Sequence, residues 1–293
     1  MVVDAMDDAT RSELAALLAE VERRAGDEAL TEEQRERLDH GDPVRHVLRR
    51  AEGGRLTGYA VIAPGTPLAA EPALGSFDLE LAAALECLGR PVTLLVREDA
   101  DLVEAELVER GWMPDRALRR LRRPLPAAPP PPTDLVVRPF EPGRDDEAWV
   151  RQNNAAFAGH PTQSHMTLEK LRARFRTEWF DPKGFLLFFD GEDLVASCWT
   201  KVHRTSRGDV GEIYVISVAP GAQRRGLGRL AVLAGLEHLA GAGIATAELF
   251  VEEVNVRAIA LYEELGFQMV SRVVELRYDG PAAQPVPTAR PTP

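Results

Sequence analysis

The sequence predicts an α/β protein with a mixed sheet, built as two tandem copies of one domain. Three observations predict this. The order helix, helix, hairpin, helix, strand, helix, strand occurs twice along the chain. A run of prolines separates the two occurrences. In the second copy, a strand at 212–218 leads through a glycine-containing loop directly into a helix, which is typical of sites for phosphate-containing ligands.

The first copy begins with two helix-start signals. Thr10-x-x-Glu13 has the residues of a capping box, and leucines follow it at helical spacing. Thr31-x-x-Gln34 marks a second start. The remaining elements are a hairpin around Glu52-Gly53-Gly54, a helix, a strand, a helix that Gly111 ends, and a last strand. They are expected at 44–50 with 56–63, 76–88, 92–96, 101–110 and 116–123.

Prolines from Pro124 to Pro132 favour extended backbone and cannot continue a helix or a central strand. We therefore expect a linker over 124–134. It separates an N-terminal domain at 1–123 from a second domain at 135–280. The proline-rich tail at 281–293 is expected to be disordered.

The second copy repeats the order of the first. Val215, Ile216 and Val218 are apolar and β-branched, so residues 212–218 are expected to form a buried strand. The other elements are two helices, a hairpin around Asp190-Gly191, a helix, a strand, a helix and a strand. They are expected at 145–157, 168–175, 185–189 with 194–203, 229–240, 245–251, 256–265 and 270–278.

The two copies differ at the glycine loop. The first copy is shorter over 64–75, where the strand and loop of the second copy have no counterpart. Counted back from the glycine that ends the late helix, Leu107 occupies the position of Tyr262. The N-terminal half is therefore expected to keep the fold and to have lost the ligand, although backbone contacts alone leave residual binding open.

The composition bounds the function classes. With 293 residues, a net charge of −11 and 45% apolar residues, the chain is an ordinary globular protein for which nucleic acid is a poor partner. No stretch has the length of a membrane span, and no secretory signal precedes the first helix, so we expect a cytoplasmic protein. Cys87 and Cys198 are expected as core residues without a disulfide, and no metal is expected. The basic run 116–123 is expected to be a solvated strand face.

Gln223-Arg224-Arg225-Gly226-Leu227-Gly228, followed by Asn255 and Tyr262, resembles the two signatures of the GCN5-related N-acetyltransferases. The resemblance implies acetyl-CoA as acetyl donor, gripped at its pyrophosphate by the loop. It implies acetyl-CoA contacts from Ile216, Ser217, Val218, Gln223, Arg224, Arg225, Gly226, Leu227, Gly228, Arg229, Asn255, Val256, Arg257, Ala258, Ile259 and Ala260.

Four further segments resemble the mycothiol synthases, a family of tandem acetyltransferases. They are 153–161 (NNAAFAGHP), 179–182 (WFDP), 199–203 (WTKVH) and 211–215 (GEIYV). This resemblance implies a monomer that acetylates the cysteinyl α-amine of cysteinyl-glucosaminyl-inositol, a thiol pseudodisaccharide, in the last step of mycothiol biosynthesis. It implies substrate contacts from Glu32, Thr162, Lys201, Glu212 and Phe250.

Amide formation needs a neutral amine, and an α-amino group has a pKa of about 8. Glu212, at the start of the strand before the loop, is the candidate base; a solvated or arginine-paired carboxylate is the alternative. Tyr262 is the candidate acid for the departing thiolate, and a stacked tyrosine is the alternative. His160 and His203 are interpreted as structural.

Three positions depart from the mycothiol synthase pattern: Thr162 replaces a glutamate, Phe250 a tyrosine and Val254 an aspartate. They leave the acetyl-transfer residues in place but weaken the acceptor assignment. Acetylation of another small amine or of a protein N-terminus therefore stays open, as does a non-catalytic CoA-binding sensor.

Overall fold

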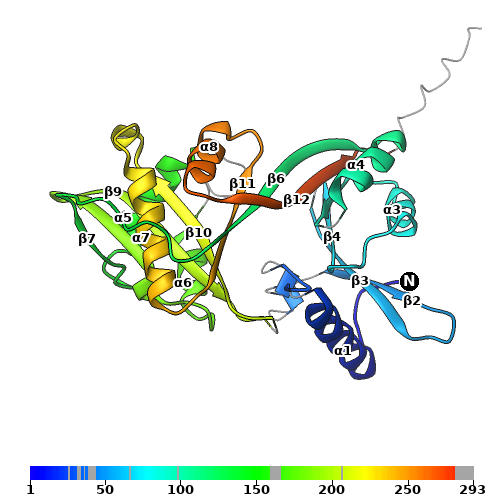
Figure 1. Cartoon of the computed structure of the whole chain (residues 1–293). Coiled ribbons are helices and arrows are strands. Elements are labelled where there is room, and N and C mark those ends of the chain that lie inside the picture. Colours follow the sequence, from blue (N-terminus) through cyan, green and yellow to red (C-terminus); the bar gives the residue numbers. More distant parts are fainter. Residues whose placement is uncertain are drawn as a thin grey trace, which may run out of the picture. The chain divides into compact units, whose positions relative to one another are not determined.

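The computed structural model (Figure 1) describes residues 1–25, 27–31, 34–35, 37–38, 44–65, 67–97, 99–158, 166–205 and 207–280. Glu32, His160, Thr162 and the tail 281–293, four subjects of the sequence-based predictions, lie outside these residues. The chain divides into two compact units, Met1–Leu118 with the segment from Ser271, and Arg119–Val270. Each is an α/β unit with a mixed sheet, so the predicted fold class is confirmed.

The first unit has a sheet in the order β1-β2-β3-β4-β5-β12. Strands β4 and β5 are parallel, and the other pairs with a recorded register are antiparallel. The bounds are β1 (Val2–Val3), α1 (Asp8–Ala25), β2 (Arg45–Arg50), β3 (Leu56–Ala63), β4 (Leu68–Pro72), α3 (Leu79–Glu86), β5 (Val92–Val96), α4 (Ala100–Glu109) and β12 (Gln268–Tyr278).

The second unit has the order β7-β8-β9-β10-β11-β6. Here β10 and β11 are parallel, while β7, β8, β9 and β10 run antiparallel to their neighbours in turn. The bounds are β6 (Met113–Pro124), β7 (Val136–Pro139), α5 (Asp146–Ala156), α6 (Leu168–Arg174), β8 (Phe185–Asp190), β9 (Asp193–His203), β10 (Val210–Val218), α7 (Leu227–Gly241), β11 (Thr246–Glu252) and α8 (Val256–Glu264).

The two sheets have the same strand order, but each is completed by the closing strand of the other copy. Strand β12 pairs with β5 of the first unit, where Val274 and Leu276 lie opposite Val96 and Leu94 in one apolar core. Strand β6 lies beside β11 in the second unit. The compact units therefore divide within β6 and near the start of β12, and not at the prolines. The last strands predicted at 116–123 and 270–278 both form, but each lies in the sheet of the other copy.

The first copy has a strand, β4, where the sequence comparison predicted that none was present. This strand lies inside 64–75, and Leu68, Ala70 and Pro72 alternate as its buried positions. Residues 73–78 alone then join β4 to α3. The first copy thus keeps the strand and lacks the glycine loop and the first turns of the helix. Strands β1 and β7 also went unpredicted, because they are short edge strands.

The helix start predicted at Thr31 has the hydrogen bonds of a capping box. The Thr31 N–H donates to Gln34 Oε1 at 2.7 Å, and the Gln34 N–H donates back to Thr31 Oγ1 at 3.2 Å. In α1 the cap lies three residues before the predicted one: the Asp7 carboxylate accepts from the Thr10 N–H at 2.8 Å. Hydrogen bonds from the side chain and the N–H of Thr10 stabilise the Asp7 carboxylate and lower its pKa.

In the second unit, helices cover both faces of β9 and β10 (Figure 1). Leu233 and Leu236 of α7 share a core with Cys198 and Ile213 on one face. On the other face, Trp199 of β9 packs in an aromatic core with Trp149 of α5 and Phe185 of β8. Helix α7 is thereby fixed across β10, with its N-terminus at the end of that strand. Among the described residues, no helix combines the length and apolarity needed to span a membrane.

The contact between α7 and the sheet depends on Gly235. A Cβ there would lie 2.5 Å from Cys198 Sγ and 2.9 Å from Ile213 Cδ1. We expect Gly235→Ala to destabilise the protein by about 1–3 kcal/mol, because overpacking forces neighbours from their rotamers. The midpoint of thermal unfolding should fall by roughly 2–4 °C per kcal/mol. Gly241→Ala, where a Cβ meets nothing within 4 Å, is the control and should keep or raise the midpoint, because alanine favours the helix more than glycine does. Equal midpoints for both variants would contradict the packing argument.

Candidate active site

The site is built around the point where β10 and β11 part. Their ladder consists of two registered pairs, Gly211–Ala247 and Glu212–Glu248. Both strands are described over their whole length, β10 to Val218 and β11 to Glu252, and no later pair joins them. A bulge between Ile213 and Val215 adds to the divergence. Beyond Glu212, β10 therefore presents backbone groups that a ligand can pair with along that edge.

The glycine loop follows β10. Gly226 is the N-cap of α7 with φ +78°, a conformation that glycine adopts without strain, and no side chain caps the helix. The first N–H groups of α7 therefore keep no side-chain acceptor, and the exposed loop 223–226 leads up to them. Such a helix start is suited to a phosphate group.

Gly228 gives a test of fit for a CoA pyrophosphate. A Cβ at Gly228 would meet only Leu261 Cδ2, at an ordinary 3.6 Å, so internal packing does not require glycine there. The absent side chain leaves the backbone of the first helical turn open to close approach by a ligand. Two of the predicted loop cations form exposed ion pairs, Arg225 with Asp190 at 2.7 Å and Arg229 with Glu264 at 3.0 Å. The residues present fit a pyrophosphate ligand.

The remaining predicted cofactor residues lie on β10 and α8. Asn255 is the N-cap of α8, and its side-chain oxygen accepts from the Ala258 N–H at 3.2 Å. Residues 256–260 form the first turns of that helix. Ser217 of β10 donates through Oγ to Gln152 Oε1 at 2.7 Å and also bonds Ser197 in the core. A ligand beside Ser217 therefore contacts its backbone.

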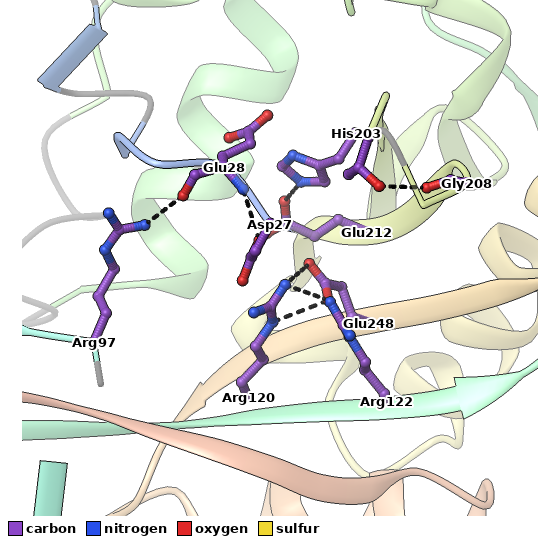
Figure 2. A network of polar contacts seen from close by, with 10 residues as sticks. Asp27, Glu28, Arg97, Arg120, Arg122, His203, Gly208, Glu212 and Glu248 are labelled. Carbon is purple, nitrogen blue, oxygen red and sulfur yellow. Dashed lines mark hydrogen bonds and ion pairs between the residues drawn. The ribbon is translucent and has the colours of Figure 1, made fainter. Parts of the chain in front are cut away.

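Glu212 and His203 form a close pair. Imidazole Nε2 lies 2.6 Å from Glu212 Oε2, and their side chains are 10% and 13% exposed for Glu212 and His203 respectively (Figure 2). The register explains the contact: Lys201 lies directly opposite Glu212, so His203, two residues on, is its diagonal neighbour on the same face. The sequence-based interpretation of His203 as a merely structural residue missed this pair.

A second carboxylate, Glu248, lies opposite Glu212 across the β10–β11 ladder. Its side chain is buried and held by two arginines of β6, with Arg122 Nε at 2.7 Å and Arg120 Nη2 at 2.9 Å from Oε2 (Figure 2). The expectation of a solvated face for the basic run is therefore wrong at Arg120 and Arg122. The signal was the alternation of the two arginines, which puts both on one face of the strand.

The predicted substrate residues that the structure describes lie near this pair of strands. Lys201 is buried, with Nζ 4.8 Å from the Trp179 ring centroid and 5.6 Å from that of Tyr214. Phe250 of β11 is 41% exposed, and the Arg120 guanidinium lies 5.6 Å from its ring centroid. Phe250 lacks the hydroxyl of the tyrosine that it replaces, so its exposed ring can offer a ligand only an apolar contact.

Tyr262 lies on α8, buried, with its ring edge-on to Phe267 at 5.9 Å. Burial raises the pKa of its hydroxyl, with a smaller contribution from the Cys198 thiol, so the phenol stays protonated at neutral pH. Within the part of the chain that the structure describes, no residue hydrogen-bonds that hydroxyl. The counterpart in the first copy, Leu107, is buried in an apolar core. Tyr262 therefore carries an uncommitted proton donor, and the first copy lacks one.

The profile of the Acetyltransferase (GNAT) family matches residues 147–267. A mycothiol acetyltransferase of Streptomyces griseus subsp. griseus is 39% identical over 298 aligned residues, covering 94% of this chain and 94% of the relative. One from Geodermatophilus obscurus is 40% identical, covering 90% and 93%.

This chain belongs to the mycothiol acetyltransferase family of GNAT proteins.

Solved structures agree on the fold of both copies together. A GCN5-related N-acetyltransferase from Sphaerobacter thermophilus superposes with a TM-score of 0.69 at 20% identity, covering 95% of each chain. A tandem GNAT protein from the clavulanic acid biosynthesis pathway superposes with a TM-score of 0.64 at 18% identity, covering 97% of this chain and 99% of that one. At these identities the likeness concerns the fold alone.

The two cysteines differ in reactivity. Both are free. Cys87 is exposed, so the expectation of a core residue is wrong for this cysteine. Cys198 is buried behind α7, which raises the pKa of its thiol to about 12. At pH 8 we expect iodoacetamide to modify one thiol per native chain and two in denaturant, because the thiolate is the reactive form. Mass spectrometry counts the adducts, and Cys87→Ser should give none in the native state. Native labelling of Cys198 would contradict its burial.

Proposed function

We propose that this protein is an acetyl-CoA-dependent N-acetyltransferase that acetylates the cysteinyl α-amine of cysteinyl-glucosaminyl-inositol, the last step of mycothiol biosynthesis. Its membership of the mycothiol acetyltransferase family over almost the whole chain supports the reaction class. The observation that carries the site assignment is the placement of Glu212 at the last pair before β10 and β11 part, on the strand whose other end leads through the loop to the uncapped start of α7.

The donor site comprises the open edge of β10, the loop and the starts of α7 and α8. Backbone N–H groups at the start of α7 face the pyrophosphate, and Gly226 and Gly228 allow it to come close. Residues 216–218 pair through their backbone with the extended arm of the donor. Bound acetyl-CoA supplies an acetyl group as a thioester, and the chain supplies position and proton transfer.

The acceptor amine enters as an ammonium ion. Glu212 takes one of its protons, directly or through water, because only the neutral amine attacks a carbonyl carbon. As the N–C bond forms and the C–S bond breaks, Tyr262 gives its proton to the sulfur. The second proton lost by the nitrogen restores the phenol. An uncommitted, fully protonated phenol suits this role better than a stacked structural tyrosine.

The acceptor pocket is assigned to residues around Lys201, Glu212 and Phe250. Glu32 and Thr162, which the resemblance also implies as substrate contacts, lie outside the described residues and stay predictions. Buried Lys201 places a cation on the same sheet face as Glu212, where it can donate to the hydroxyls of a polyol. Phe250 cannot donate, which is the observation that favours a second candidate acceptor, another small amine or a protein N-terminus. Retention of Glu212, the loop and Tyr262 argues against a sensor without activity.

The test is acetylation of defined amines. The acceptor carries a thiol, so CoA and acetyl-CoA are separated by chromatography and the product is weighed by mass spectrometry. We expect one acetyl group on the α-amine of cysteinyl-glucosaminyl-inositol. Glucosaminyl-inositol and a peptide beginning with cysteine, assayed alongside, should react at least ten times more slowly. Faster turnover of the peptide would overturn the acceptor, and acetyl-CoA binding without turnover of any amine would favour the sensor.

Tyr262→Phe tests the acid. Removing the hydroxyl should lower kcat by about 100-fold or more, the usual range for a general acid, and leave the affinity for acetyl-CoA nearly unchanged. Since burial raises the Tyr262 pKa above the ordinary value of about 10, wild-type kcat should not fall between pH 8 and 10. Tyr278→Phe, at a tyrosine stacked on Trp112 in the first unit, is the matched control. Turnover persisting in Tyr262→Phe would rule out the assignment.

A further inference from the structure

A carboxylate alone is a poor match for the proton that must be removed. An ordinary glutamic acid has a pKa of about 4.3 and an α-ammonium group one of about 8, so the transfer is uphill by a factor of several thousand. General bases act best when their pKa lies near the pH at which they work. An imidazole, with an ordinary value of about 6.5, is the side chain closest to that condition. The site has one in contact with the carboxylate.

The His203–Glu212 contact has the geometry of a shared proton. At 2.6 Å it is at the short end for a hydrogen bond to an ionised acceptor. An ionised carboxylate only accepts, so this contact is a hydrogen bond when Nε2 of His203 carries a proton, and both side chains are largely shielded from water. Each residue is held by the regular β9–β10 ladder, in which Lys201 and Val210 pair with Glu212 and His203. The pair is therefore fixed by backbone register.

We infer that Glu212 and His203 work as one proton-accepting pair, in which Glu212 faces the substrate amine and His203 holds the positive charge that the accepted proton creates. This inference deepens the proposed function and rests on it. Before the step Glu212 is ionised and the neutral imidazole carries its proton on Nδ1, so that Nε2 has a lone pair. The ammonium N–H bond breaks, its proton passes to Glu212, and the proton moves on to Nε2, where it is hydrogen-bonded to Oε2. It leaves to solvent after the amide forms, so no other reactant is needed. His203 acts through Glu212 and is a positioning residue.

Other charges face the pair. Lys201 lies on the same face of β9, and exposed Arg204 follows His203 in the chain. Across the ladder, Glu248 stands opposite Glu212, and Arg120 and Arg122 hold its charge. Because Glu248 is bound to two cations, it adds little repulsion against ionised Glu212. The Glu212 carboxylate is in direct contact with the imidazole and favours its imidazolium form.

His203→Gln tests the pair through its pH profile. Glutamine keeps an N–H donor at about the position of Nε2 but cannot take a proton near neutral pH. In the wild type we expect kcat to rise with pH with a midpoint between about 6.5 and 7.5. In His203→Gln that midpoint should move down by at least one pH unit, and the plateau should fall about tenfold. His238→Gln, on α7 away from this face, is the control for loss of a histidine and should keep the wild-type profile. A wild-type midpoint in His203→Gln would overturn the inference.

A second measurement does not depend on turnover. The Cε1–H proton resonance of His203, assigned by its loss in His203→Gln, should titrate at least one pH unit higher in the wild type than in Glu212→Gln, which lacks the negative charge. Equal midpoints would overturn the pair. Failure of the proposed function would be seen in turnover and not in the titration of the resonance. The wild type would acetylate no amine, or Glu212→Gln would remain fully active.

Discussion

The parting of β10 and β11 after one pair of glutamates is the constraint on which the rest of the second unit depends. Up to Glu212 and Glu248 the two parallel strands are hydrogen-bonded, and beyond them they are not. If the two strands were paired along their whole length, no backbone N–H or C=O groups on this edge of β10 would remain for a ligand. The aromatic core on one face and α7 on the other keep the strands rigid although part of their edges is unpaired. The site is thus a gap maintained by packing on both sides.

The same divergence accounts for the charges. Two buried carboxylates in adjacent strands would repel each other at considerable cost if both were unpartnered. Glu248 is satisfied by Arg120 and Arg122, and Glu212 contacts His203. One carboxylate is therefore committed to cations that cannot release their charge, and the other to a residue that can gain and lose a proton. This difference in partners separates a structural role from a role in proton transfer.

The two copies exchange their closing strands and share one strand order, but they differ at the residues proposed to bind a ligand. The first unit has the strand order of the second, with apolar β12 residues filling its core, and yet has neither the glycine loop nor a tyrosine on α4. In the first unit a shorter helix, α3, and a short connection from β4 fill the corresponding part of the core. The second unit retains its long α7 because that helix positions the loop as well as the core.

The sequence by itself determined the fold class, the repeat and the residues of the loop, because these depend on local patterns. Alternating apolar residues, a proline run, and glycines at fixed spacing act over a few positions. It also singled out Glu212 and Tyr262 as candidates. It misplaced the cap of α1, missed β4 and gave each copy its own last strand, since these choices are made by competition between partners distant in sequence. Only the tertiary structure decided that His203 contacts Glu212 and that Arg120 and Arg122 hold Glu248. Those contacts follow from strand register, which residue types alone do not specify.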